Sequence, residues 1–392
     1  MNEKAIEQMR RLYDSFKQLK DFRVRQARVE YPLSQILFMS LIGIIKGNVT
    51  YDDLSTWMHF TAKSSEIFKK IFDISEIKIP SRSTLHGILI NIDNNELEVI
   101  FREYFIKYCK LKNISVDGKW LNGSDIDGQY TNESHKSIFN ILDKDIKIVF
   151  AHKFLHKDKI SEIPAFNDFL EEKEFIKEGQ IYSFDALMTQ SKSINLINDN
   201  NNKYVAKVKG NQENLKQKII QTIDEFESPT QIYEEDSMIE NNRYINRTIE
   251  LYNSNSCDIV MFHKEFKNIQ TLIKITKIIT NPKENMKQTI TTQYLIANFK
   301  TTAKKFSQIV KFHWRIETYH YHLDNLTKED KHIAYKAPFS FSILRSFTIN
   351  LYQLYLNENK DKRVMRSQKV TMANIKKCCV YDDEFVANLF GI

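Results

Sequence analysis

The chain has 392 residues, of which 42% are hydrophobic and 12% aromatic, so it is long and apolar enough to fold as two or three domains. The formal net charge of +7 favours a polyanionic partner only weakly, because many ordinary enzymes are this basic. The four cysteines lack zinc-site spacing, the charged N-terminal segment lacks the apolar stretch of a secretory signal, and the longest apolar run, 36–45, is too short to span a bilayer. We therefore expect a soluble cytoplasmic protein.

Residues 1–110 are predicted to form a helical N-terminal domain. Apolar side chains recur at helical spacing from Leu33 to Ile44, and Gly47 and Asn48 end that segment. Thr50 is placed to cap a helix that begins at Tyr51 and continues to Phe60. Two further helices are expected, one carrying Leu85, Ile88 and Leu89 after the turn 80–84 and one over 96–109.

From about residue 111 the periodicity changes to that of β-strands. A short apolar strand ends in Asp117, where Gly118 allows a sharp turn, and the segment 180–186 repeats the pattern with Asp185. The other elements predicted in this part are the strands 137–142 and 146–154, joined by a hairpin turn at 143–145, a helix over 161–171, a helix over 190–196 and a strand over 203–209. The order β-β-β-α-β-α-β-α, with carboxylates on the first and fourth strands, is the RNase H-like arrangement.

The remaining elements complete an α/β fold class. We predict an RNase H-like catalytic domain with a β-rich insertion and a helical N-terminal domain: the first part of the core over 111–228, the insertion over 229–300, and the last part over 301–392. The elements expected there are a helix over 213–227, strands over 245–251, 271–279 and 289–298, and helices over 303–326 and 339–356. No internal repeat is evident, which excludes solenoids.

Three acidic residues, Asp117, Asp185 and Glu317, form the candidate catalytic set. Each alone has an ordinary alternative, since an Asp that follows a strand is commonly a turn former or a helix cap. Two Asp at strand ends and a Glu on a helix are, however, the ligand set of a two-metal phosphoryl-transfer site. Mg²⁺ prefers carboxylate oxygens and keeps several waters, so two or three such side chains suffice.

Around these residues the sequence resembles the ISAs1-type insertion-sequence transposases, a branch of the IS4-like DDE group. The stretches that carry the resemblance occur in family order from about residue 25 to 390: 31–33 (YPL), 80–84 (PSRST), 117–119 (DGK), 162–165 (EIPA), 185–186 (DA), 209–212 (KGNQ) and 313–317 (HWRIE). The chain departs from the family pattern at Trp120, Leu121 and Asn122, over 241–247, and after Glu317, where Thr318 and His320 stand.

The resemblance implies a Mg²⁺-dependent enzyme, with Mn²⁺ able to substitute, that cleaves double-stranded DNA at the ends of an insertion sequence and transfers the strand to target DNA. It implies that Asp117, Asp185 and Glu317 bind the metal ions. A homodimer that brings two DNA ends together and a location in the bacterial cytoplasm, at the nucleoid when active, are the matching expectations. The helical N-terminal domain then either binds DNA ends or serves in packing or dimerisation.

DNA contacts are predicted for residues near the candidate acids and in the insertion. Each has an alternative as a solvated strand end, a turn or a hydrogen-bonded neighbour. The candidates are Lys119, Lys209, Asn211, Gln212, Arg243, Arg247, Lys311, His313 and Arg315.

Two other classes of function stay open at this stage. The chain is alternatively a transposase-derived nuclease that cuts without joining, which only a strand-transfer product would separate from a transposase. It is alternatively a non-catalytic DNA-binding protein, against which the three intact acidic residues argue, because binding alone needs no metal ligands.

Overall fold

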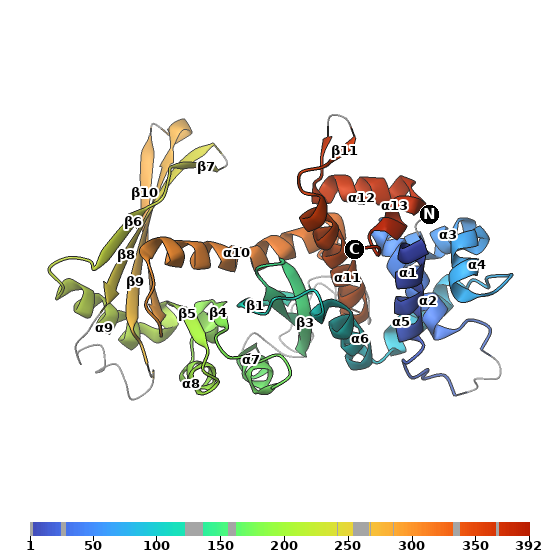
Figure 1. Cartoon of the computed structure of the whole chain (residues 1–392), viewed down its shortest axis with the longest axis horizontal. Coiled ribbons are helices and arrows are strands. Elements are labelled where there is room, and N and C mark those ends of the chain that lie inside the picture. Colours follow the sequence, from blue (N-terminus) through green and yellow to red (C-terminus); the bar gives the residue numbers. More distant parts are fainter. Residues whose placement is uncertain are drawn as a thin grey trace. The chain divides into compact units, whose positions relative to one another are not determined.

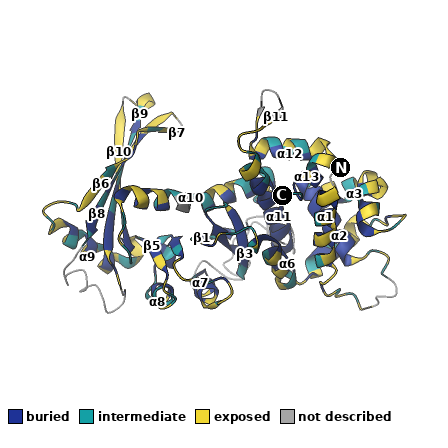
Figure 2. Ribbon diagram, viewed as in Figure 1, coloured by how far each residue is buried: buried dark blue, intermediate teal, exposed yellow. Residues whose placement is uncertain are grey.

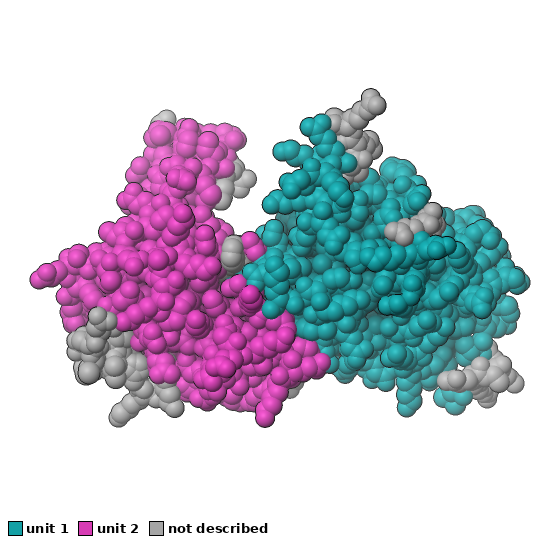
Figure 3. Space-filling view, in the orientation of Figure 1, with its two compact units in different colours: residues 1–110, 118–159, 317–392 teal, residues 111–117, 160–316 magenta. Residues whose placement is uncertain are grey.

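The structure is a computed structural model that describes residues 3–24, 29–121, 136–155, 162–240, 242–253, 266, 268–284, 286–331, 338–365 and 368–392. The chain divides into two compact units, shown in two colours in Figure 3. Unit 1 comprises residues 1–110, 118–159 and 317–392, and unit 2 comprises 111–117 and 160–316. Strand β1 (Asn113–Trp120) and helix α10 (Ala303–Leu326) each contribute residues to both units.

Unit 1 is mostly helical (Figure 1). Its N-terminal helices are α1 (Glu3–Phe16), α2 (Leu33–Ile45), α3 (Tyr51–Phe60), α4 (Glu66–Phe72), α5 (Arg82–Asn91) and α6 (Asn94–Ile106). Its other elements are the antiparallel hairpin β2 (Ser137–Asp143) and β3 (Ile148–Leu155), helix α11 (Pro338–Asn359), the hairpin β11 (Arg363–Met365) and β12 (Gln368–Lys369), and helices α12 (Met372–Tyr381) and α13 (Asp383–Asn388).

Local sequence accounts for where the N-terminal helices begin. The side chains of Thr50, Ser65, Ser81 and Asp93 each accept a hydrogen bond from a backbone N–H in the first turn of the helix that follows, at α3, α4, α5 and α6. Helix α2 is mostly apolar, and every one of its residues is buried, including Ser34, Gln35 and Ser40 (Figure 2). The predicted helical N-terminal region is confirmed.

The core of unit 1 is aromatic. Phe347 of α11 is fully buried, and its ring centroid lies 5.0 Å from those of Phe101 and Phe105 of α6 and 6.3 Å from that of Phe16 of α1. The Tyr352 hydroxyl donates a 2.5 Å hydrogen bond to the Ile45 carbonyl at the end of α2. Helix α11 therefore joins the N-terminal helices into one core.

Unit 2 is built on a large mixed sheet. Its strands are hydrogen-bonded in the order β1-β4-β5-β10-β9-β8-β6, with β7 beside β8; β1, β4 and β5 run parallel and the rest antiparallel. The strands are β4 (Ile181–Phe184), β5 (Lys203–Val208), β6 (Gln231–Glu234), β7 (Met238–Glu240), β8 (Arg243–Asn253), β9 (Thr271–Asn281) and β10 (Lys287–Ala297), and the helices are α7 (Glu162–Glu171), α8 (Ser191–Asp199) and α9 (Glu213–Asp224). A mixed α/β fold is confirmed.

The first half of α10 packs on this sheet. Ala303, Phe306 and Ile309 share a buried cluster with Ile249 of β8 and Leu295 of β10. Their spacing of three residues keeps them on one face of the helix. The first half of β10, residues 287–292, is by contrast exposed (Figure 2).

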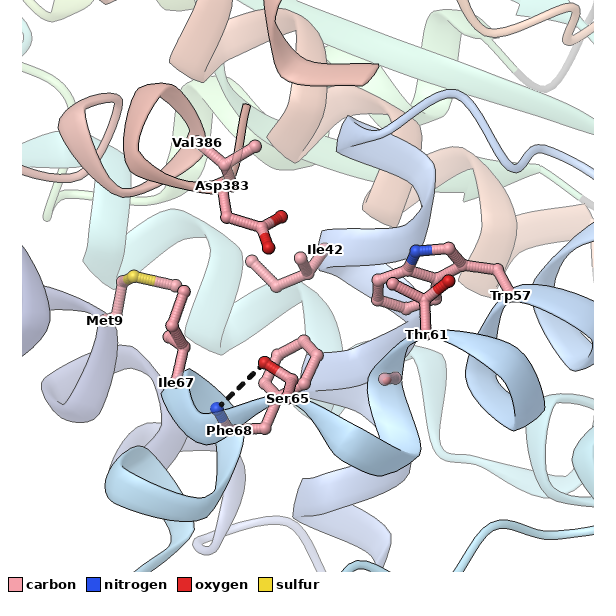
Figure 4. A pocket seen from close by; sticks show the side chains of 10 residues that line it. Met9, Ile42, Trp57, Thr61, Ser65, Ile67, Phe68, Asp383 and Val386 are labelled. Atoms are coloured by element: carbon pink, nitrogen blue, oxygen red, sulfur yellow. Dashed lines mark hydrogen bonds between the residues drawn. The ribbon is translucent and has the colours of Figure 1, made fainter. Parts of the chain in front are cut away.

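A small cavity of ≈ 20 Å³ lies among the helices of unit 1 (Figure 4). Met9, Ile42, Trp57, Thr61 and Asp383 are among its lining residues. The cavity has room for about one water molecule, so it is too small to bind a nucleotide or a substrate group.

In the described part of the chain, no helix combines the length and hydropathy needed to cross a bilayer.

Candidate active site

Two of the predicted acidic residues lie at matching positions on adjacent parallel strands of unit 2. Strand β1 pairs with β4 in a register that places Ser115 opposite Ser183. Asp117 and Asp185 each follow that pair by two residues, and Asp185 keeps an extended backbone (φ −75°, ψ 172°) just beyond β4. Because neighbouring strands lie about 4.8 Å apart, the register brings the two carboxylates to one edge of the sheet.

The Asp185 carboxylate forms ion pairs with two lysines, Lys207 on β5 and Lys209 just after that strand. Lys209 Nζ lies 3.1 Å from Asp185 Oδ2, and Lys207 Nζ lies 3.7 Å from Oδ1. Burial alone raises the pKa of Asp185, but the backbone amide of Ala186 and the two lysines outweigh it and leave the pKa below its ordinary value. Asp185 is therefore ionised at neutral pH.

One oxygen of Asp185 is suited to a cation. Among the described residues Oδ1 is shielded from solvent and accepts no hydrogen bond. Carboxylate oxygens are the ligands that Mg²⁺ prefers, so the donor atoms of Asp185 and Asp117 are of the right chemical kind. Metal binding by the two residues stays a prediction. Within the part of the chain that the structure describes, no group of three His, Cys, Asp or Glu side chains forms a metal cluster.

Replacing Lys209 by Gln is expected to raise the pKa of Asp185, because the amide loses the charge that favours the carboxylate. The folded pKa of Asp185 lies below its unfolded value of about 3.9. Ionised Asp185 therefore stabilises the fold above that pH, and this contribution is lost as the pH falls through the folded pKa. Carboxyl ¹³C NMR titration of Asp185 measures the shift. Lys192→Gln, which removes a lysine paired with Glu171, is the control and should leave Asp185 unchanged.

An open groove of ≈ 400 Å³ follows the end of β5. Asn211 and Gln212, predicted to contact DNA, line it together with Gln190 and Ser191. Asn211 also donates a 2.9 Å hydrogen bond from Nδ2 to the carbonyl oxygen of Ala186, the residue after Asp185. The segment 209–212 thus supports the backbone beside Asp185 and presents polar groups to the groove.

Glu317 lies on α10 with an exposed side chain. In the division into units it is the first α10 residue of unit 1, whereas Asp117 and Asp185 belong to unit 2. It follows Trp314 by one helical turn. Its membership of the metal site stays a prediction.

Lys119 is buried, so it is neither the DNA contact nor the solvent-exposed lysine considered from the sequence. Its side chain is 7% exposed, and its ammonium lies 2.7 Å from Asp324 Oδ1 and 3.1 Å from Asp330 Oδ1. We therefore do not carry it forward as a DNA contact.

The two insertion arginines also differ from each other. Arg243 is exposed near the start of β8, whereas Arg247 is buried, 3.6 Å from Glu235 and 4.2 Å over the ring of Trp314. Lys311 Nζ lies 2.7 Å from the same Glu235. The structure thus gives Arg247 a packing role in place of the phosphate contact predicted for it. The side chain of His313 lies outside the described residues, and Arg315 is partly buried.

Sequence reasoning missed Lys207 and the acidic partners of Lys119. Lys207 lies on β5, two residues before Lys209, and the alternation of side chains along a strand puts both on one face. This spacing could have indicated that Lys207 also lies beside Asp185. Asp324, Glu329 and Asp330 lie far from Lys119 in the chain, and no local pattern connects them.

Comparison with known families gives two matches. Residues 137–343 match the family described as "Transposase DDE domain", which is more than half of the chain, and residues 13–105 match one described as "DDE_Tnp_1-associated". Asp185 and Glu317 fall inside the first range, and Asp117 falls between the two.

The chain is also similar to two proteins named as putative transposases and to one solved structure. The chain is 24% identical to "Putative transposase YncI" of Escherichia coli O157:H7 over 81% of this chain and 80% of that protein. It is also 24% identical to "H repeat-associated putative transposase YhhI" of Escherichia coli K12, over 88% and 90%. Among solved structures, a piggyBac transposase synaptic complex with hairpin DNA gives a TM-score of 0.47 at 11% identity, over 99% of this chain and 79% of that one.

Proposed function

Since the chain belongs to the family described as "Transposase DDE domain", we propose that it is a transposase that cleaves DNA at the ends of its element and joins them to target DNA. We assign it to the ISAs1 type of insertion-sequence transposase on the motifs given above. Double-stranded DNA is its substrate, and a homodimer in the bacterial cytoplasm brings the two element ends together.

The observation that carries the proposal is the shared register of Asp117 and Asp185. Parallel β1, β4 and β5, with the antiparallel hairpin β2–β3 between β1 and β4 in the chain, support an RNase H-like core. In such a core the first and fourth strands carry the catalytic acids. Glu317 of α10 is proposed as the third.

Asp117, Asp185 and Glu317 would hold two Mg²⁺ ions, or Mn²⁺ in their place. Metal ions held there would supply activation of the attacking oxygen and charge stabilisation at the leaving oxygen. Asp185 enters the reaction ionised, because the Ala186 amide, Lys209 and Lys207 outweigh the effect of burial and keep its pKa below the ordinary value. Lys209, half exposed beside that carboxylate, is placed to contact a phosphate of the bound strand.

The test is incubation of the purified protein with DNA that carries the element's own ends, a target plasmid and Mg²⁺. Cleaved ends joined to the plasmid, lost on chelation with EDTA, are the expected result. Cleavage without joined products would instead identify a nuclease. Tight binding to the ends with no metal-dependent cleavage would leave a DNA-binding protein and overturn the proposal.

Arg243 and Arg247 form a matched pair for testing the DNA surface. Arg243→Gln should weaken binding to element ends and reduce the slope of log affinity against log salt by about 1, because an exposed phosphate contact is lost. Arg247→Gln should instead lower the free energy of unfolding by about 1–3 kcal/mol, since it removes a buried guanidinium from its ion pair with Glu235 and from the ring of Trp314. Fluorescence anisotropy at several salt concentrations and thermal unfolding separate the two. A normal salt slope in Arg243→Gln would remove that residue from the DNA surface.

A further inference from the structure

Lys119 is the centre of a buried cluster of charges in unit 1. Besides the contacts to Asp324 and Asp330, its ammonium lies 3.9 Å from Glu329 Oε2. Glu329 has a side-chain exposure of 1%. Burying one lysine among three carboxylates is costly unless the geometry is good and the charges are paired, so this arrangement needs a reason.

The cluster joins the two elements that carry candidate catalytic acids. Lys119 follows Asp117 by two residues on β1, and strand alternation places both side chains on one face of the strand. Asp324 follows Glu317 by seven residues on α10, which is about two turns and therefore the same face of the helix. Glu329 and Asp330 belong to the segment directly after α10.

The ion pairs of Lys119 fix strand β1 and helix α10 near their C-terminal ends. Neighbouring Thr327 donates a 2.6 Å hydrogen bond from its hydroxyl to the Leu323 carbonyl, which holds the end of α10. On the strand side, the backbone N–H of Leu121 donates to the carbonyl of Lys136, so the chain just past Lys119 is also held. The lysine therefore connects two anchored segments.

We propose that Lys119 is a positioning residue. Its buried ion pair with Asp324 holds the part of α10 that carries Glu317 against the end of β1 within unit 1, and so orients Glu317 for metal binding. The proposal rests on the transposase function given above. It assigns Lys119 no contact with DNA, since its ammonium is enclosed by carboxylates.

The test compares Lys119→Met with Lys46→Met. Lys46 is a matched control because it belongs to the same unit and has a side-chain exposure of 9%. Its ammonium lies 2.7 Å from Asp383, which is not a candidate acid. Three quantities are measured on the full chain: Mn²⁺ binding by electron paramagnetic resonance, affinity for element-end DNA, and the rate of end cleavage.

Lys119→Met is expected to weaken Mn²⁺ binding and slow cleavage, each by about 10–100-fold, as is usual when a residue that orients metal ligands is lost. DNA affinity should change less than about twofold, and Lys46→Met should leave Mn²⁺ binding and cleavage unchanged. Should Lys119→Met fail to fold, Asp324→Asn serves in its place, because it weakens the pair while Lys119 keeps Glu329 and Asp330. That variant should show a smaller loss of the same two quantities.

Wild-type Mn²⁺ binding and cleavage in both Lys119→Met and Asp324→Asn would overturn the inference. So would a loss of DNA affinity with Mn²⁺ binding intact, which would make Lys119 a DNA contact. Failure of the underlying function is distinguishable, because the unaltered protein would then show no metal-dependent cleavage at all.

Discussion

Asp185→Asn is expected to lower the rate of metal-dependent end cleavage by about 10³-fold or more while DNA binding persists. The amide keeps the size of the side chain but removes the charge that the carboxylate offers a cation. A metal ion contributes several kcal/mol to transition-state charge stabilisation, and about 4 kcal/mol corresponds to a thousandfold in rate. Single-turnover cleavage of end-labelled DNA in Mg²⁺ measures the loss.

Asp199→Asn is the matched control, since Asp199 is an exposed aspartate of the same unit at the end of α8. Its cleavage rate should equal that of the unaltered protein. If Asp185→Asn cleaved as fast as this control, Asp185 would have no part in the chemistry, and its pairing with Lys207 and Lys209 would be structural.

The second large effect concerns the aromatic core of unit 1. Phe347→Ala should lower the free energy of unfolding by about 3–5 kcal/mol, because a fully buried ring is removed from contact with helices α1 and α6. A loss of this size lowers the melting temperature by about 10 °C for a unit this large. Circular dichroism and differential scanning calorimetry follow the transition.

Phe60→Ala provides the comparison, since Phe60 ends α3 with 84% of its surface exposed. Its stability should stay within about 0.5 kcal/mol of the unaltered protein. A similar small change in Phe347→Ala would show that α11 is not the element that unites the N-terminal helices.

Local patterns in the sequence predicted the elements whose limits are encoded locally. Helix α3 runs from Tyr51 to Phe60 with Thr50 as its cap, and α10 runs from Ala303 to Leu326, both as expected. The strand periodicity around Asp117 and Asp185 predicted β1 and β4 as well. The expected strand end at Asp117 and sharp turn at Gly118 were wrong, however, because β1 continues through Gly118 to Trp120.

Elements that depend on distant partners were not predictable in this way. Strands β6 and β7 have four and three residues and pair only along β8, so they lack a pattern of their own. Helices α12 and α13 were likewise missed, because they are short and bury only a few side chains each. The compact units group residues 1–110 with 118–159 and 317–392, which reflects contacts between segments distant in the chain. The four consecutive domains expected from the sequence stay a prediction.

The candidate site shows the same division between local and distant information. Position along the chain predicted Asp117 and Asp185, and the register of β1 and β4 pairs Ser115 with Ser183, two residues before each of them. The surroundings of Lys119 and Arg247 depend on Asp324 and Glu235, which are remote in sequence. A strand-end lysine and a strand arginine have the same sequence pattern whether they are solvated or buried in an ion pair.

Iron-directed cleavage of the backbone tests most directly the central claim that Asp117, Asp185 and Glu317 bind the same metal ions. Fe²⁺ takes the place of Mg²⁺ at carboxylate sites and, with peroxide and ascorbate, cuts the peptide backbone close to the bound ion. The account predicts cuts near all three residues, suppressed by excess Mg²⁺ and lost in Asp185→Asn. Cuts near Asp117 and Asp185 without any near Glu317 would contradict it.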